Sequence, residues 1–153
     1  MPPVPWLALG DQFLLDGVDW HVSAVTVARA DRMSFRVLGV EPALGGGALL
    51  LLQTEDALYE VAPIRGNDLG EEVGYVDSRM VRLSWRGEVA TERVSDGGRR
   101  RFGRGQCAWY TDENGTVAVR ITERDADEAV MGAPLAPGRI DLSFTEGLRG
   151  GRG

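Results

Sequence analysis

Two short turn sequences, in a chain without helical periodicity, most constrain the fold. Asp16-Gly17 and Asn114-Gly115 each separate apolar or alternating runs. Such pairs favour two-residue turns whose twist matches that of antiparallel strands. No stretch of 11–18 residues repeats its apolar side chains at helical spacing. We therefore predict a mainly β protein built from antiparallel strands and hairpins.

Alternation and β-branched content place the individual strands. Val18, Trp20 and Val22 fall on one face, and the alternation breaks after Ser23, which predicts a β-bulge near Ser23 and Ala24. The predicted strands cover residues 12–15, 18–27, 34–40, 48–53, 58–64, 79–86, 106–111, 117–122 and 140–144.

The length of 153 residues suits one domain, and 43% hydrophobic with 26% charged residues is typical of a folded globular chain. We predict a single mainly β domain over residues 1–145, followed by a disordered tail over residues 146–153. The domain is either a small sandwich or two small barrel-like halves. In the second case the halves are residues 1–64 and 76–145, joined by an acidic, glycine-rich loop at 65–75.

The residue counts exclude several chemistries. A single cysteine, Cys107, and a single histidine, His21, allow neither a disulfide in a monomer nor a zinc site built from Cys or several His. All seventeen basic residues are arginine, so a P-loop lysine and a lysine Schiff base are absent. We predict no catalytic residues, no metal and no cofactor, and we favour binding over catalysis.

The start of the chain and its apolar runs bear on location. The opening residues MPPVPWLALGDQF have no basic region before their apolar stretch, so no signal peptide is expected. The longest apolar run, residues 48–52, is far shorter than the roughly 20 residues that span a bilayer. We expect a cytoplasmic protein without a transmembrane segment.

Charge is segregated along the chain. The net charge of −6 combines a block of −7 over residues 41–77, +5 over 78–107 and −5 over 108–147. The basic block contains the loop GGRRRFGRGQ, in which an aromatic ring lies among guanidinium groups. Such a loop suits phosphates, a nucleic-acid strand or an acidic protein surface. The candidate binding residues are Arg82, Arg86, Arg99, Arg100, Arg101, Phe102 and Arg104.

Alternation over residues 79–86 predicts two faces for this part of the basic block. The predicted inward residues are Val81, Leu83 and Trp85. The predicted outward residues, near the basic loop, are Arg82, Ser84 and Arg86. Two structural alternatives stay open: these arginines pair with Glu88 or Glu92, or the basic loop neutralises residues 65–77 of the same molecule.

The acidic residues and the lone histidine give weaker candidates. Asp68, Glu71 and Glu72 offer carboxylates for a cation or a polyamine, although their spacing matches no calcium motif and also suits a solvated loop. His21 lacks a recognisable partner for acid–base chemistry, and Cys107 suits a small core residue.

Two stretches resemble a bacterial family, domain-of-unknown-function family 4178. The opening LALGDQFLLDGVDWHVSAVTV is similar in its Gly-Asp pair, its Gly turn and its Trp-His-Val, and RRFGRGQCAWYTDENGTVAVRITE is similar to that family's second half. The segment SFRVL stands where the family has a Trp-rich strand. The resemblance implies a mainly β, non-enzymatic protein. Members are encoded beside polyamine-synthesis enzymes and phage-shock-type membrane-stress proteins.

These observations lead to one functional prediction and two alternatives. We predict a non-enzymatic binding or adaptor module, linked to envelope stress or polyamine metabolism, that binds a protein partner or itself. The first alternative is a small enzyme with a carboxylate and histidine site in the mouth of a β-barrel. The second is nucleic-acid binding through the Arg-rich loop, which the net negative charge disfavours.

Overall fold

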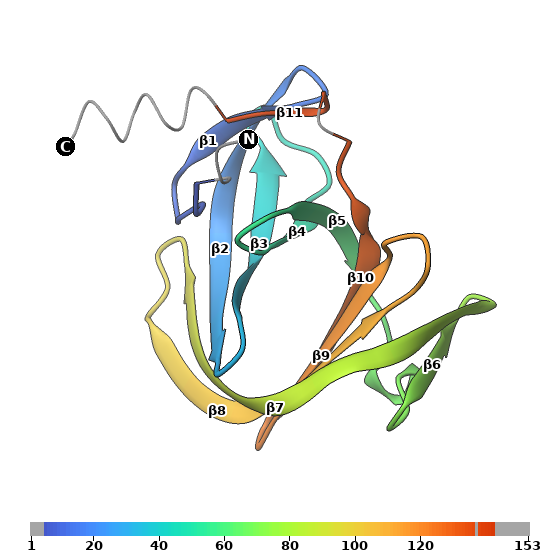
Figure 1. Ribbon diagram of the computed structural model, residues 1–153. Coiled ribbons are helices and arrows are strands. Elements are labelled where there is room, and N and C mark those ends of the chain that lie inside the picture. Colours follow the sequence, from blue (N-terminus) through green and yellow to red (C-terminus); the bar gives the residue numbers. More distant parts are fainter. Residues whose placement is uncertain (1–4, 137, 143–153) are drawn as a thin grey trace.

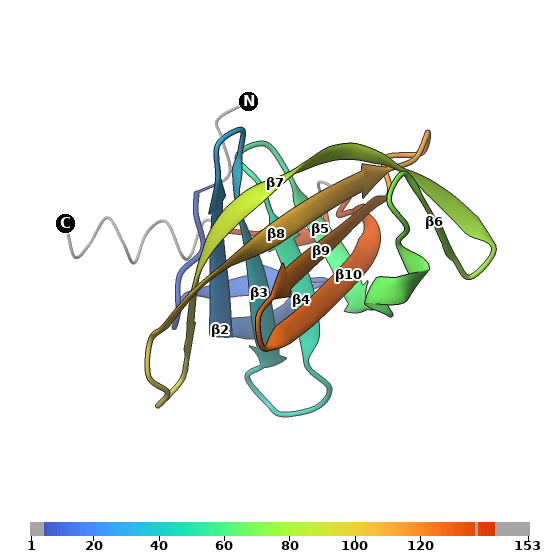
Figure 2. The ribbon, with the colours of Figure 1, turned by 90° about the horizontal axis from the view of Figure 1, so that it is seen from below.

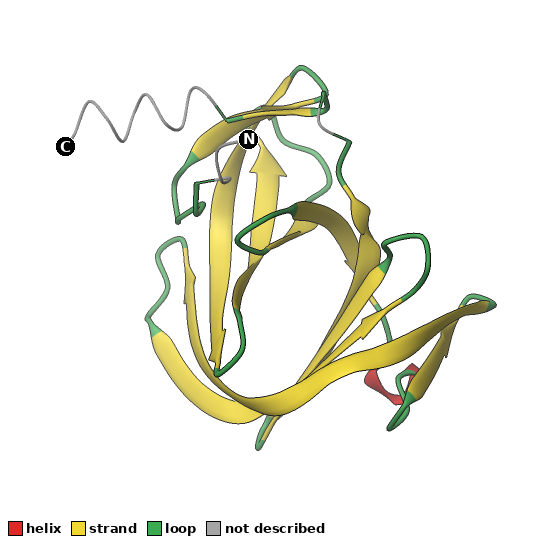
Figure 3. Cartoon of the chain, viewed as in Figure 1, coloured by secondary structure: helices red, strands yellow, loops and turns green. Residues whose placement is uncertain are grey.

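Strands form almost all of the regular structure in the computed structural model, which describes residues 5–136 and 138–142 (Figure 3). The elements are β1 (Gln12–Leu15), β2 (Val18–Ala30), β3 (Ser34–Pro42), β4 (Leu49–Gln53), β5 (Leu58–Pro63), the short 3-10 helix η1 (Gly66–Asp68), β6 (Val73–Val76), β7 (Arg79–Ser95), β8 (Arg101–Thr111), β9 (Val117–Glu123), β10 (Ala126–Pro134) and β11 (Ile140–Asp141). The prediction of a mainly β fold with antiparallel hairpins is confirmed. The predicted tail at residues 146–153 lies outside the described residues.

Eight strands close into one barrel, seen along its axis in Figure 1. Their order is β2-β3-β4-β5-β10-β9-β8-β7, and residues 89–95 of β7 pair with residues 24–30 of β2 to complete the circle. β1 and β11 extend the sheet beside β2, and β6 extends it beside β7. None of the helices among the described residues reaches the length and apolarity required to cross a membrane.

The two predicted halves contribute to this one barrel instead of forming two. Strands β2–β5 come from residues 1–64 and β7–β10 from residues 76–145, and the halves meet at the β2–β7 and β5–β10 pairs. Four strands alone would leave two unpaired edges, and closure pairs both. The segment predicted as a loop, residues 65–75, contains η1 and the start of β6.

The bulge predicted in β2 is confirmed. The register of β2 against β3 shifts between Val22 and Ala24. The shift falls where β2 changes its other neighbour, from β1 to β7. The additional residue places Val22 and Val25 in the same apolar cluster although they are three positions apart.

Apolar side chains fill the interior of the barrel. Phe35 from β3 and Trp109 from β8 meet edge to face, with ring centroids 5.4 Å apart. Cys107 beside them is completely buried, as expected for a core residue, and burial raises the pKa of its thiol to about 12. The buried members of this cluster are Ala28, Phe35, Leu52, Val61, Val89, Cys107, Trp109, Val117, Val119, Ile121 and Val130.

Two further clusters lie outside the barrel. The N-terminal segment covers β3 and β4, where the buried Gln53 side chain accepts a hydrogen bond from Leu7 N at 2.9 Å and donates one to Pro5 O at 2.7 Å. Residues 66–76, which we call the flap, cover the other side. The flap buries Leu69 and Val76 against the outer surface of β7–β10.

Candidate functional site

The outward side chains of β7 and β8 form the surface on which the candidate residues lie. Val89, Cys107 and Trp109 face the interior of the barrel, so their neighbours along each strand face outward. The outward residues of this part of the sheet are Arg86, Glu88, Ala90 and Glu92 on β7, and Phe102, Arg104, Gln106, Ala108 and Tyr110 on β8.

A bulge at Ser84 overturns the prediction that Arg82 and Arg86 share a face. The register of β7 against β8 shifts between Leu83 and Trp85. Arg82 therefore lies opposite Thr111, whereas Arg86 lies opposite Ala108, and these two β8 residues point to opposite faces. The additional residue on β7 turns Arg86 towards the flap.

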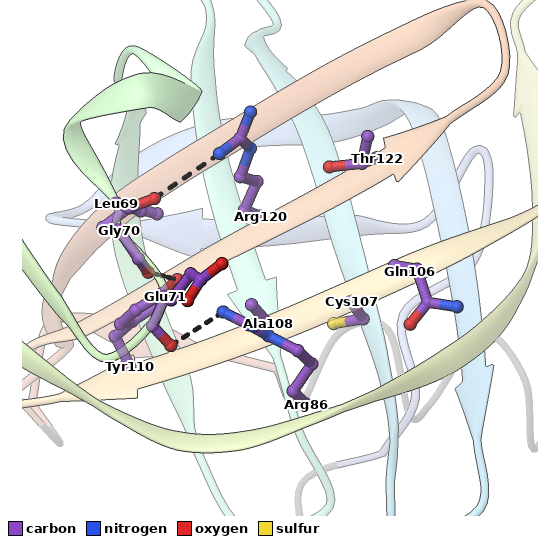
Figure 4. Close-up of a pocket in the computed structure, with 10 residues that line it drawn as sticks. All are labelled: Leu69, Gly70, Glu71, Arg86, Gln106, Cys107, Ala108, Tyr110, Arg120 and Thr122. Carbon is purple, nitrogen blue, oxygen red and sulfur yellow. Dashed lines mark hydrogen bonds between the residues drawn. The ribbon is translucent and has the colours of Figure 1, made fainter.

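The flap is fastened to the barrel by three side chains from three neighbouring strands (Figure 4). Arg120 of β9 donates to the Leu69 carbonyl at 3.4 Å, and the Tyr110 hydroxyl of β8 donates to the Gly70 carbonyl at 2.5 Å. Arg86 of β7 donates to the Glu71 carbonyl at 2.8 Å. Three consecutive backbone carbonyls are thus held beside a hollow of about 470 Å³.

Arg120 is itself fixed by a carboxylate. Its Nε and Nη2 donate to the two oxygens of Asp127 at 2.9 and 2.7 Å, and these bonds hold the pKa of Asp127 below its ordinary value. Gly66 of the flap lies against this pair, and a Cβ there would come within 2.7 Å of Asp127 Oδ1. The pair and the glycine together set how closely the flap approaches the sheet.

The acidic residues of the flap do not converge on one point. Asp68, Glu71 and Glu72 are all exposed. Within residues 5–136 and 138–142, no group of three or more His, Cys, Asp or Glu side chains is arranged to hold a metal ion. The prediction of a polyamine or a cation at these residues stays a prediction.

Residues 99–104, which we call the arginine hairpin, lie at the far end of β7 from the flap (Figure 2). Arg99, Arg100, Arg101, Phe102 and Arg104 are exposed, and the Phe102 side chain is 75% exposed. The structure therefore separates these residues from Arg82 and Arg86, which the sequence placed nearby. The flap does not cover the hairpin, because β9, β8 and β7 hold it at the other end.

The counter-charges of the arginine hairpin are few. Arg100 Nε lies 3.1 Å from Glu92 Oε1, and Arg29 of β2 lies 3.6 Å from the other oxygen of Glu92. Glu92 therefore pairs with these two residues and not with Arg82 or Arg86. Within the described part of the chain, Arg104 makes no hydrogen bond or ion pair through its side chain.

Closure of the barrel brings Arg29 to this surface. Arg29 lies opposite Ala90, and Ala90 lies opposite Arg104, so the three residues form one row across β2, β7 and β8. Hollows of about 370 and 380 Å³ lie along this row. The first of them shares Gln106 with the hollow beside the flap. The hollows of about 370 and 380 Å³ share Arg29, Ala90 and Arg104 in their lining, and we call these two hollows the arginine groove. Sequence patterns did not reveal Arg29, because its partner strand is about 60 residues away.

The single histidine lies beside two carboxylates. His21 is about one-third exposed, with Nε2 3.7 Å from Glu41 and 3.8 Å from Asp96. At the barrel end where β9 meets β10, Glu123 and Glu128 are ion-paired with Arg93. His21 with Glu41 and Asp96 is thus one group, and Arg93 with Glu123 and Glu128 is another. The enzymatic alternative stays a prediction.

Comparison of the chain with known protein families, with curated proteins and with solved structures finds no match. The resemblance to family 4178 therefore stays a prediction.

Proposed function

We propose that this chain is a cytoplasmic, non-enzymatic binding module whose arginine hairpin docks an acidic segment of a protein partner. One observation carries the proposal: the strongly exposed Phe102 ring lies two positions from Arg104, a cation without a partner among the described residues. Exposed aromatic and arginine side chains are the commonest anchors of protein interfaces. A guanidinium also binds a carboxylate through two parallel hydrogen bonds.

A protein partner fits this surface better than a nucleic acid. Glu88 and Glu92 share the outward face of β7 with Ala90. These two carboxylates interrupt the continuous basic track that a nucleic-acid backbone follows, and the net charge of −6 also disfavours nucleic acid as the general partner. A polypeptide can instead present a carboxylate to Arg104 and neutral groups to the glutamates. The link to envelope stress or polyamine metabolism stays a prediction from the family resemblance.

The proposal is tested with fluorescein-labelled poly-L-glutamate of about 20 residues, followed by fluorescence anisotropy. We expect saturable binding that weakens as salt is raised, because exposed charges are screened. Replacing Arg99, Arg100 and Arg101 by serine should lower the affinity about tenfold or more. Circular dichroism confirms that the variant is folded.

A matched control separates a specific surface from net charge. Replacing Arg65, Arg79 and Arg82 by serine removes the same charge at the flap end of β7. This variant should bind poly-L-glutamate within about twofold of the wild type. Equal loss in both triple variants would show non-specific attraction. Tighter binding of a single-stranded oligothymidylate than of poly-L-glutamate would support the nucleic-acid alternative and contradict the proposal.

A further inference from the structure

We infer that the hairpin formed by β6 and the start of β7 is a surface on which two copies of this chain associate face to face. The surface consists of Val73 and Tyr75 on β6, Asp77 in the turn, and Met80 and Arg82 on β7. It lies at the other end of β7 from the arginine hairpin. The inference therefore adds an interaction to the proposed function and does not depend on it.

Residues 73–82, which we call the outer hairpin, project beyond the barrel (Figures 1 and 2). Asp77 and Ser78 form a two-residue turn and both have positive φ, as this kind of turn requires. Val76 and Val81 are buried in the cluster beneath the flap, so one face of the outer hairpin is covered. The residues that alternate with them lie on the opposite face, and they are Val73, Tyr75, Met80 and Arg82.

An exposed apolar pair forms the centre of this second face. Tyr75 lies directly opposite Met80, and the two side chains are 66% and 40% exposed. The described residues expose five large apolar side chains in all, and these two are neighbours across the strands. Side chains opposite each other on antiparallel strands are about 5 Å apart, so the pair forms one continuous patch. Tyrosine and methionine are enriched in the cores of protein interfaces.

Opposite charges flank the apolar pair. Arg82 lies two positions from Met80 on the barrel side, and Asp77 lies two positions from Tyr75 at the turn, which places each about 7 Å along the hairpin from the pair. Within the described residues, neither Arg82 nor Asp77 forms an ion pair or a hydrogen bond through its side chain. Arg79, which alternates to the other face, donates to Thr116 Oγ1 at 3.2 Å. The patch therefore has one positive and one negative end.

This distribution of charge selects a second copy as the partner. When two outer hairpins lie face to face and antiparallel, with their apolar pairs in contact, Arg82 of each copy meets Asp77 of the other. A two-fold axis relates the copies, so the charge pair forms twice. Parallel packing would place like charges together, which is unfavourable. A contact of about five residues a side is smaller than the standard interface of about 20–30, so the dimer is weak and reversible.

Sedimentation velocity of the full chain tests the inference, over concentrations from about 10 µM to about 1 mM, where weak dimers form. The weight-average mass should rise from that of a monomer towards that of a dimer. Replacing Tyr75 and Met80 together by serine should weaken self-association about tenfold or more. Replacing Val18 and Leu44 by serine removes two other exposed apolar side chains and is the matched control. This control should associate within about twofold of the wild type.

Charge reversal tests the antiparallel arrangement. Arg82→Glu gives the patch two negative ends and Asp77→Arg gives it two positive ends, so each variant alone should self-associate about tenfold more weakly or worse. An equal mixture of the two should associate at least as strongly as the wild type, because opposite charges then meet at both ends. Circular dichroism checks the fold, since Asp77 has positive φ. Asp77→Gly suits that φ, removes one charge without straining the turn and should also weaken self-association.

Three results would overturn the inference. They are a wild type that stays monomeric at about 1 mM, self-association of the Tyr75 and Met80 variant at wild-type strength, and a mixture of the charge-reversed variants that fails to associate. Replacing Arg99, Arg100 and Arg101 by serine should leave self-association unchanged, and its loss there alone would place the contact at the arginine hairpin. The Tyr75 and Met80 variant should still bind poly-L-glutamate, so failure of the dimer leaves the proposed function standing.

Discussion

Docking of the flap on the barrel should be stabilised more by one buried leucine, Leu69, than by the hydrogen bonds that the flap accepts. Leu69 is 2% exposed and packs with Val81 and Ala118 on the outer surface of the sheet. Truncating a buried leucine to alanine costs about 2–5 kcal/mol, and a flap that can settle into the space lies near the low end, at about 2–3 kcal/mol. Tyr110→Phe removes one hydrogen bond to an exposed glycine, which is worth about 1 kcal/mol.

Urea unfolding followed by tryptophan fluorescence measures both costs. Trp85 and Trp109 pack in the barrel core and report its exposure. Leu44→Ala serves as the control because its side chain is 98% exposed, and it should change the free energy of unfolding by less than about 0.5 kcal/mol. If Tyr110→Phe proved as costly as Leu69→Ala, hydrogen bonding would dominate and the argument from burial would be refuted.

Two further predictions concern the barrel core. Gly103→Ala should cost about 2 kcal/mol in thermal or urea unfolding, because a Cβ there would meet the Glu123 carboxylate at 2.1 Å and displace it from its ion pair with Arg93, whereas Gly47→Ala, which meets nothing, should be neutral. Equal changes in the free energy of unfolding for Gly103→Ala and Gly47→Ala would contradict this prediction. The thiol of Cys107 has a pKa raised to about 12, so its neutral form stabilises the fold up to the unfolded pKa of about 8.5 and that contribution is lost as the pH rises further. At about pH 10 the loss is about 2 kcal/mol relative to neutral pH. This loss of unfolding free energy should be absent in Cys107→Ala. An equal decline with pH in the wild type and in Cys107→Ala would disprove the prediction.

The local structure was predictable because alternation and turn residues act over a few positions. Asp16-Gly17 forms the two-residue β1–β2 turn, with both residues at positive φ. The hairpin at Asn114-Gly115 also forms, but its loop spans residues 112–116. There the Asp112 carboxylate accepts hydrogen bonds from Asn114 N and Thr116 N and organises a longer turn. Closure through the β2–β7 and β5–β10 pairs was not predictable, since alternation gives a strand's faces and not its neighbours.

The site was predictable only in part. The arginine hairpin was found from composition, because four arginines and a phenylalanine lie within six residues. The role of Arg86 depends on one additional residue in β7, and a bulge in a run that alternates well leaves no trace in the sequence. Arg29 and Ala90 meet only through barrel closure. The row of Arg29, Ala90 and Arg104 thus depends on the tertiary structure, whereas the arginine hairpin can be recognised from consecutive residues of the sequence.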